Sequence, residues 1–337
     1  MLLSVAIPVY NEAASLPKLV SVLRQVLSDM GCDYEVIFVN DGSTDGSLQV
    51  LREGAGSDHR IKVLSFGRNF GHQAAITAGL DFAQGDAVVV MDADLQDPPE
   101  LLPEMVELFK KGFDVVSAQR ITRHGDTFFK RGTASLFYWV MRRMVDERLV
   151  AEVGDFRLFS RAALLAIRSF REQHRFMRGV VAWIGLKEAV VPFERQARTA
   201  GATKYSLSKM VKFAWTAISS FSALPLRLSL PLGALLTGAG VAYFVYSVYV
   251  ALVEKTAVPG WTSLVCLQVM FSGATLMAVG LLGDYVARIY EEVKRRPLYV
   301  VTDTINVAAN ASEGNRAVVL ASRELPVAQA KMSVGRF

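Results

Sequence analysis

The sequence predicts an α/β protein in which a doubly wound, mostly parallel sheet is followed by an interfacial helix and two transmembrane helices. Apolar runs of strand length alternate with helical segments through the first 120 or so residues, which is typical of a parallel sheet. Two apolar stretches of about 25 residues follow, and each is long enough to cross a bilayer core of about 30 Å. The 337 residues therefore predict a head followed by a membrane anchor.

The strands and helices of the head are expected in regular alternation. We expect strands over 4–10, 34–39, 61–66, 88–90, 114–119 and 189–193, and helices over 15–30, 48–53, 71–82, 100–111 and 126–144. Ser15 and an early Pro17 favour the start of the first helix, and Gly31 favours its end. A basic loop is expected over 195–204, where the head ends.

The fourth expected strand ends in two carboxylates, Asp92 and Asp94, one residue apart. The carboxyl ends of strands face the binding crevice in open α/β sheets, so both side chains are expected at its edge. Their mutual repulsion would be relieved by a hard divalent cation, Mg²⁺ or Mn²⁺, carrying a substrate diphosphate. The alternative is a pair of solvated carboxylates at a strand end, and this short motif alone does not decide between them.

Composition excludes several classes of protein. The formal charge of +5 is modest and scattered, which argues against nucleic acid as a partner but suits an anionic membrane surface. Two cysteines, Cys32 and Cys266, provide neither a disulfide framework nor metal-ligand spacing. The first residues lack the charged region and cleavage site of a signal peptide, and they are expected to form a strand instead.

The second half predicts membrane attachment. Residues 206–227 mix basic and aromatic side chains, which suits a helix in the membrane interface, with an amphipathic core helix as the alternative. Basic residues flank the two apolar spans on their outer sides, whereas the connecting loop holds only Glu254 and Lys255. By the positive-inside rule the head and both termini are expected to be cytoplasmic, at the inner membrane.

Four segments follow from these patterns. They are a head over 1–205, a juxtamembrane helix over 206–227, a two-helix hairpin over 228–286, and a C-terminal segment over 287–337 that is expected to be poorly ordered from about Thr302. Glycines in the spans suit close packing of helices, within the hairpin or between protomers of a homo-oligomer. These glycines are Gly233, Gly238, Gly240, Gly273, Gly280 and Gly283.

Six motifs in order resemble the polyprenyl-phosphate glycosyltransferases of GT-A family 2, which include dolichyl-phosphate mannose synthases and bactoprenol glucosyltransferases. The resemblance covers about residues 4 to 300, together with the two spans. The motifs are PVYNE at 8–12, NDGSTD at 40–45, RNFGH at 68–72, DADLQDPPE at 92–100, GDFRL at 154–158 and YEEVKRRPLY at 290–299. The resemblance implies a GT-A, Rossmann-like head that uses Mg²⁺ or Mn²⁺.

The resemblance also implies roles for individual residues. On the donor side, Pro8, Tyr10, Glu12 and Asp41 would line the nucleoside pocket, Asp92, Asp94 and Gln96 would lie at the metal and diphosphate, and Arg198 and Lys204 would belong to a loop that closes over the diphosphate. On the acceptor side, Arg120, Arg131 and Ser135 would bind the polyprenyl phosphate, with Arg123, Lys130 and Arg175 as looser candidates. The structural alternative for the residues of the nucleoside pocket is that they only stabilise turns at the ends of strands. The alternative for the acceptor-side residues is a helix face that only contacts anionic lipid.

Asp155 stands where the family has its catalytic base. A phosphate monoester has a second pKa of about 6, so the acceptor oxygen is already ionised at neutral pH and needs little deprotonation. Asp155 is therefore also a candidate for orienting the acceptor or the sugar, or for capping a turn beside Gly154.

The implied reaction is an inverting transfer of a sugar from a nucleotide sugar to a membrane polyprenyl phosphate, for glycosylation of the cell envelope. The segments 154–161, 176–179 and 182–185 resemble the glucosyltransferase branch, which favours UDP-glucose over GDP-mannose or another UDP-sugar as donor. Two rivals remain. A processive polysaccharide synthase would need more spans, and an inactive membrane scaffold would leave the carboxylates unexplained.

Overall fold

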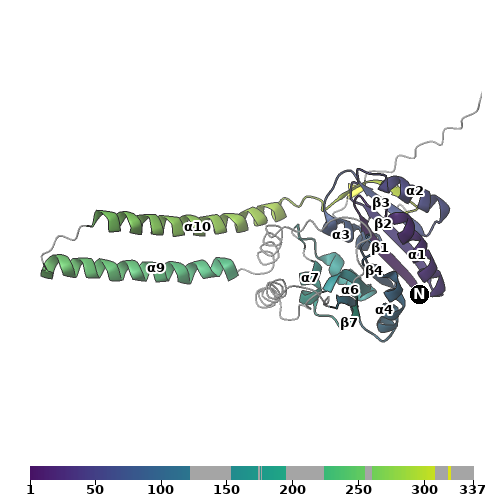
Figure 1. The fold of residues 1–337 in the computed structure, drawn as a ribbon, viewed down its shortest axis with the longest axis horizontal. Helices are drawn as coiled ribbons and strands as arrows, with labels where there is room; N and C mark the ends of the chain where they lie inside the picture. The colour runs from purple at the N-terminus through teal and green to yellow at the C-terminus, as the bar shows by residue number, and fades with distance from the viewer. Residues whose placement is uncertain are drawn as a thin grey trace, which may run out of the picture.

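The computed structural model describes residues 1–121, 153–173, 175, 177–194, 224–254, 260–307 and 318–319. Figure 1 shows a head built around a twisted sheet and a long helical hairpin that projects away from it. The expected helix over 126–144, the basic loop over 195–204 and most of the juxtamembrane segment lie outside the described residues.

Within this described part, nine strands form one sheet in the order β7-β5-β6-β4-β1-β2-β3-β8-β9. The first four strands, β1 (Leu2–Val9), β2 (Asp33–Asn40), β3 (Ile61–Phe66) and β4 (Ala87–Val90), pair in parallel around β1. Two more, β5 (Val115–Arg120) and β7 (Glu188–Phe193), form a second parallel pair. The mostly parallel sheet expected from the alternating pattern is confirmed.

Helices cover both faces of the sheet, as a doubly wound fold requires. One apolar core joins the sheet to α1 (Leu16–Asp29), α2 (Ser47–Ser57) and α4 (Leu102–Lys110), which follows a short 3₁₀ turn, η1 (Pro99–Leu101). The other core joins it to α3 (His72–Phe82), α6 (Arg161–Ser169) and α7 (Met177–Ile184). Buried leucines recur along α1 at helical spacing, and each contributes about 1.5–3 kcal/mol on burial.

Three strands of the described part run against the others, and sequence reasoning missed all three. The first is β6 (Val153–Ser160), which lies between β4 and β5 and is antiparallel to each. The second is β8 (Val300–Ile305), which pairs antiparallel with β3 and in parallel with the third, the short β9 (Val318–Val319). Residues 302–305 thus lie in a strand, whereas most of the tail that is expected to be poorly ordered lies outside the described residues. The β-branched run of β8 completes the sheet edge that β3 leaves open.

Pro8 marks the place where β4 leaves the sheet. The pairing of β1 with β4 runs from Leu3 to Ala6, and the backbone N–H of Met91 still donates to Ala6 O over 3.2 Å. Pro8 lacks the N–H that would continue a ladder, although β1 stays paired with β2 beyond this point. The chain after Met91 is thus free to turn away and form the site described below.

The hairpin consists of α9 (Leu224–Tyr249), a π-helical turn η2 (Val250–Glu254) and α10 (Trp261–Val293). Both long helices contain a stretch that is long and apolar enough to cross a membrane, Leu226–Tyr246 and Met270–Val293, and neither stretch is buried inside the protein. Large apolar side chains such as Phe244 and Leu276 are about two-thirds or more exposed. This indicates membrane association, because water is a poor environment for such a surface.

One of the six glycines brings the two hairpin helices together. A Cβ atom on Gly240 of α9 would lie 3.0 Å from Cζ of Phe271 in α10, so the helices pack closely there. A Cβ on Gly233, Gly238, Gly273, Gly280 or Gly283 would meet nothing within 4 Å. The packing expected within the hairpin is confirmed at Gly240 only.

The end of α10 is bonded directly to the head. Glu292, in its last turn, accepts a hydrogen bond from the backbone N–H of Gln173 over 2.9 Å, and the Gln173 amide donates to Arg296 O over 2.6 Å. Farther along, the Tyr299 hydroxyl donates to Asp81 at the end of α3 over 2.7 Å. Asp81 is also held by a bidentate pair with Arg171. The hairpin and α3 are therefore mechanically connected.

Candidate functional site

The turn after β4 carries a group of acidic and amide side chains. The Asp92 N–H donates to Asp97 Oδ2 over 3.1 Å, and the Gln96 N–H donates to Asp94 Oδ1 over 3.1 Å. Leu95, which lies between Asp94 and Gln96, has a φ of 59°. This left-handed conformation costs a non-glycine residue on the order of 1–3 kcal/mol. The chain therefore folds back on itself through two carboxylate–backbone contacts and one strained residue.

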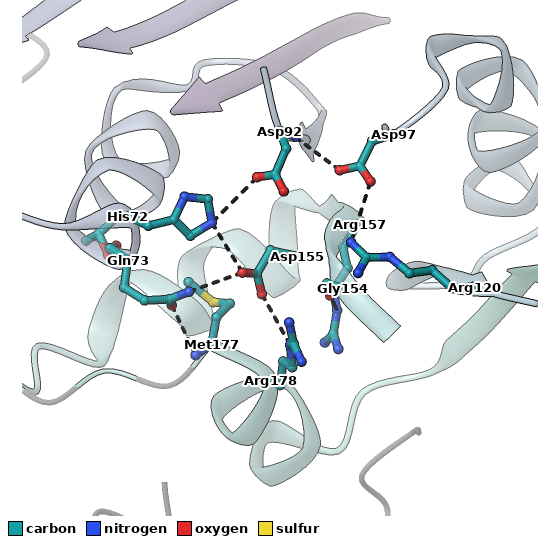
Figure 2. Close-up of polar contacts among 11 residues, drawn as sticks. His72, Gln73, Asp92, Asp97, Arg120, Gly154, Asp155, Arg157, Met177 and Arg178 are labelled. Atoms are coloured by element: carbon teal, nitrogen blue, oxygen red, sulfur yellow. Dashed lines mark hydrogen bonds and ion pairs between the residues drawn. The ribbon is translucent and has the colours of Figure 1, made fainter. Parts of the chain in front are cut away.

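The antiparallel strand β6 brings Asp155 to the same place. In the pairing of β4 with β6, Val90 lies opposite Arg157, so continuing this register by two residues sets Asp92 opposite Asp155. Figure 2 shows the two carboxylates facing each other across the site. Residues more than 60 positions apart in sequence thus meet because β6 runs opposite to β4.

Two consecutive residues at the start of α3 connect these carboxylates. His72 Nε2 lies 3.6 Å from Asp92 Oδ1 and 3.4 Å from Asp155 Oδ2 (Figure 2). The Gln73 amide donates to the same Asp155 oxygen over 3.2 Å and accepts from the Met177 N–H over 3.3 Å. Asp155 is therefore held from α3 and indirectly from α7.

Three arginines surround the Asp155 side of the site. Arg178 Nε lies 3.5 Å from Asp155 Oδ1, and the Nε of buried Arg157 donates to Gly154 O over 3.3 Å. Arg120 lies against Gly154, where a Cβ atom would come within 3.0 Å of its guanidinium, and is 3.9 Å from Asp97 Oδ1. A side chain at position 154 would therefore require the Arg120 guanidinium to shift by a few tenths of an ångström. Figure 2 shows all three arginines around the 154–155 segment.

The carboxylates of the two strand ends have opposite electrostatic settings. Burial and then the charge of Asp92 raise the pKa of Asp97 to about 7, and burial also raises the pKa of Asp92. Burial acts in the same direction on Asp155, but His72 and Arg178 outweigh it and hold the pKa of Asp155 well below its usual range. Asp155 is therefore ionised at neutral pH, whereas burial disfavours the ionised forms of Asp92 and Asp97 in the turn after β4.

The oxygen atoms of this turn suit a hard divalent cation. Asp92 and Asp94 provide carboxylates, and Gln96 Oε1 is buried without a hydrogen-bond partner within the described structure. Oxygen donors of this kind are those that Mg²⁺ and Mn²⁺ prefer. Among the described residues no three His, Cys, Asp or Glu side chains are close enough to hold a metal ion by themselves. The donor set therefore fits a cation whose coordination substrate oxygens and water complete.

The expected nucleoside wall lies at the ends of β1 and β2. Asp41 is buried and accepts hydrogen bonds from the N–H groups of Phe70 (2.7 Å) and Gly71 (3.0 Å), so it fixes the loop before α3. Burial raises the pKa of Asp41 in spite of these bonds. Glu12 accepts from the Ser15 hydroxyl over 2.7 Å, and Pro8 is buried within β1.

An open cleft of about 650 Å³ lies beside this wall. Tyr10, which is 48% exposed, is the one expected nucleoside residue among the described residues that line it. Gly42 permits its shape, because a Cβ there would lie 2.4 Å from the Arg68 carbonyl carbon and its φ is 64°. Other lining residues are Asn40, Ser43, Arg52, Arg68, Asn69 and Asp303.

The structure brings together Asp92, Arg120 and Asp155 of the expected site (Figure 2), and Asp94 and Gln96 lie in the same turn as Asp92. Four further expected residues, Arg131, Ser135, Arg198 and Lys204, lie outside the described residues. Arg175, a looser candidate for the acceptor phosphate, instead bonds Thr77 Oγ1 and Ile167 O inside the head.

Sequence reasoning assigned no role to four residues of the site, which are His72, Gln73, Asp97 and Arg178. Signals for three of them were present. His72 ends the RNFGH motif, Asp97 lies within the DADLQDPPE motif, and Arg178 follows Phe176 in a segment that resembles the family. Gln73 had no such signal.

Comparison with known proteins gives a consistent result. Residues 4–168 match the family described as glycosyl transferase family 2. An uncharacterized glycosyltransferase, YkcC of Bacillus subtilis (strain 168), is 44% identical over 304 residues, which cover 90% of this chain and 94% of that protein. The bactoprenol glucosyl transferase of Shigella phage SfII is 37% identical over 301 residues, covering 89% and 97%.

Among solved structures, glucosyl-3-phosphoglycerate synthase from Mycobacterium tuberculosis has a similar fold. It was solved in complex with Mn²⁺, uridine diphosphate and phosphoglyceric acid. The TM-score is 0.50 at 18% sequence identity, and the alignment covers 64% of this chain and 76% of the synthase. This likeness supports a GT-A head.

Proposed function

Because the chain belongs to glycosyl transferase family 2 and is a glycosyltransferase, we propose that it transfers glucose from UDP-glucose to the phosphate of a membrane polyprenyl phosphate. The likeness to a bactoprenol glucosyl transferase over nearly the whole chain supports both the sugar and the acceptor. The structural observation that carries the proposal is a carboxylate-lined site in a head that also carries an exposed apolar hairpin. A lipid acceptor explains why one chain combines them.

The reaction forms a bond between an acceptor phosphate oxygen and the anomeric carbon of the glucose. The acceptor oxygen attacks the face of that carbon opposite the diphosphate, the bond from the carbon to the diphosphate oxygen breaks, and UDP leaves with the electron pair. This single in-line displacement inverts the configuration. The acceptor oxygen is already ionised at neutral pH, since the second pKa of a phosphate monoester is about 6. A general base is therefore not required.

The residues of the site divide the work. Asp92, Asp94 and Gln96 would hold a Mg²⁺ or Mn²⁺ ion, which when bound neutralises charge on the leaving diphosphate. Arg120, beside Gly154, would bind the acceptor phosphate. Asp155 is ionised and already paired with cations, so we assign it to orienting the acceptor side of the site and not to accepting a proton.

The attachment of the hairpin supports the expected topology. The chain leaves α10 at Val293 and re-enters the sheet of the head as β8 at Val300. The segment after the hairpin therefore lies on the same side of the membrane as the head. This agrees with the expectation that the head and both termini are cytoplasmic. The site would then face the inner leaflet, where both substrates meet.

The proposal is tested with purified protein in lipid vesicles that contain a polyprenyl phosphate and Mn²⁺. UDP-glucose, UDP-galactose, UDP-N-acetylglucosamine and GDP-mannose are supplied in turn, each with a radiolabelled sugar. We expect label in the lipid fraction with UDP-glucose. Transfer from GDP-mannose alone would replace the donor assignment, and no transfer from any donor would refute the proposed acceptor.

A further inference from the structure

His72 occupies a position set by residues on the donor side of the site. It is the first residue of α3 and follows Gly71, whose φ of 101° is in a region that favours glycine. The N–H groups of Phe70 and Gly71 are both bonded to Asp41, which follows β2. The backbone of His72 is therefore fixed by the nucleoside wall, through Asp41 at the end of β2.

The side chain of His72 lies between two carboxylates on neighbouring strands. One ring nitrogen, Nε2, lies between Asp92 at the end of β4 and Asp155 at the start of β6, at 3.6 and 3.4 Å (Figure 2). Asp92 and Asp155 lie opposite each other when the antiparallel register is continued, and their two negative charges repel each other. A donor placed between them offsets this repulsion and sets their separation.

The exposure of His72 argues against a packing role. Its side chain is 46% exposed, whereas the fold is held by residues that are almost completely buried. Truncating an exposed ring leaves no internal cavity, so a substitution here is expected to leave the head folded. The polar contacts of the ring described here are those of Nε2 with the carboxylates of Asp92 and Asp155.

We propose that His72 is a positioning residue that fixes the distance between Asp92 and Asp155. Asp92 belongs to the turn after β4 that would hold the donor diphosphate, here called the donor wall. Asp155 belongs to the segment of β6 beside Arg120, here called the acceptor wall. This inference rests on the proposed function, because it concerns the alignment of the acceptor oxygen with the anomeric carbon. Misplacing reacting groups by about 1 Å costs on the order of 100-fold in rate. His72 would thus affect the rate of transfer more than the binding of either substrate.

The test compares His72→Leu with His72→Gln in the vesicle assay. Gln retains an amide N–H at about the reach of Nε2, whereas Leu has similar bulk and no donor. We expect His72→Leu to lower kcat by about 10- to 100-fold and His72→Gln to recover most of the loss. The KM for UDP-glucose and the calorimetric affinity for UDP with Mn²⁺ should each stay within about 3-fold of wild type.

His59→Leu is the matched control, because His59 is exposed in the loop before β3 and far in sequence from the site. It should match wild type in kcat and in Tm. A double-mutant cycle with Asp155→Asn adds a second readout, since residues that act through one another lose less together than the sum of the single losses. Additive losses in kcat would show that His72 does not act through Asp155.

Three results would overturn the inference. The first is a loss of less than about 3-fold in kcat for His72→Leu, and the second is no difference between His72→Gln and His72→Leu. The third is a loss of UDP affinity large enough to account for the loss of rate. The third result would make His72 a donor-binding residue. Failure of the proposed function is distinguishable from all of these, because wild type itself would then transfer no glucose to the lipid.

Discussion

The two walls of the site differ in how their carboxylates are balanced. On the donor wall, Asp92 and Asp97 lie close together, and burial raises the pKa of each. On the acceptor wall, Asp155 has His72, Gln73 and Arg178 within 3.5 Å. The donor wall therefore holds carboxylates whose charge is costly to bury, whereas the acceptor wall holds a carboxylate that its partners keep ionised.

This difference indicates what each wall receives. Buried carboxylates with raised pKa values favour binding of a cation that arrives with the substrate, as does the Gln96 oxygen, which has no hydrogen-bond partner among the described residues. A compensated carboxylate has nothing to gain from a further cation and instead keeps neighbouring groups in position. The donor wall is thus suited to binding and the acceptor wall to orientation.

Asp94→Asn should have the largest effect, because it removes charge from the wall that depends on it. We expect transfer to polyprenyl phosphate to fall by about 10²–10³-fold, with weaker Mn²⁺-dependent binding of UDP. Product formation in vesicles and calorimetry measure the two effects. Asp33→Asn, an exposed change at the amino end of β2, is the control. An Asp94→Asn variant as active as wild type would show that the donor wall holds no cation.

Asp155→Asn should have a smaller effect if the acceptor wall only orients. The amide retains the shape of the side chain and can still contact His72 and Arg178, so we expect a loss of about 10-fold in kcat. A required general base contributes about 10²–10⁴-fold, and a loss in that range would break the comparison between the walls. Rates under saturating donor and acceptor decide between these outcomes.

Asp97→Asn should change stability in a pH-dependent way. The pKa of Asp97 is about 7 in the folded protein against 3.8 ordinarily, so its contribution to stability is complete below pH 3.8 and is lost as the pH rises through 7. The Asn variant cannot ionise and avoids that loss. Without metal, its Tm relative to wild type should rise by a few degrees between pH 5 and pH 8. A constant difference across this range would contradict the raised pKa.

Glu292→Gln, far from both walls, should have the smallest effect. It weakens the charge-assisted bond from the Gln173 N–H to the end of α10, worth about 1 kcal/mol. We expect Tm to fall by about 2–4 °C and transfer to change by less than about 3-fold. Glu104→Gln on the exposed side of α4 serves as control. A much larger loss of transfer would mean that the walls depend on the hairpin for their alignment.

The donor wall was predictable because its residues are contiguous. A buried strand followed at once by Asp92 and Asp94 gives both the position and the chemistry, and the structure places Gln96 in the same turn. The support of Asp92 by Asp97 was not predictable, because it depends on the left-handed Leu95 that folds the chain back.

The acceptor wall was predictable only in part. Asp155 was recognised through a motif, but its place opposite Asp92 follows from an antiparallel strand between parallel neighbours. A polar stretch such as VGDFRLFS gives a weak strand signal, since Asp155 and Arg157 interrupt the apolar pattern. The contacts of His72 and Arg178 depend on how α3 and α7 pack, which local pattern does not specify.

The connection between α10 and β8 has a consequence for how the enzyme meets its lipid. Only six residues separate them, so the end of the hairpin stays within about 20 Å of the sheet edge. The hydrogen bonds of Gln173 and Tyr299 hold the end of the hairpin and the head still closer together. The head is therefore held against the end of the hairpin by chain connectivity and by hydrogen bonds, and we expect it to act on its lipid without moving far from that end.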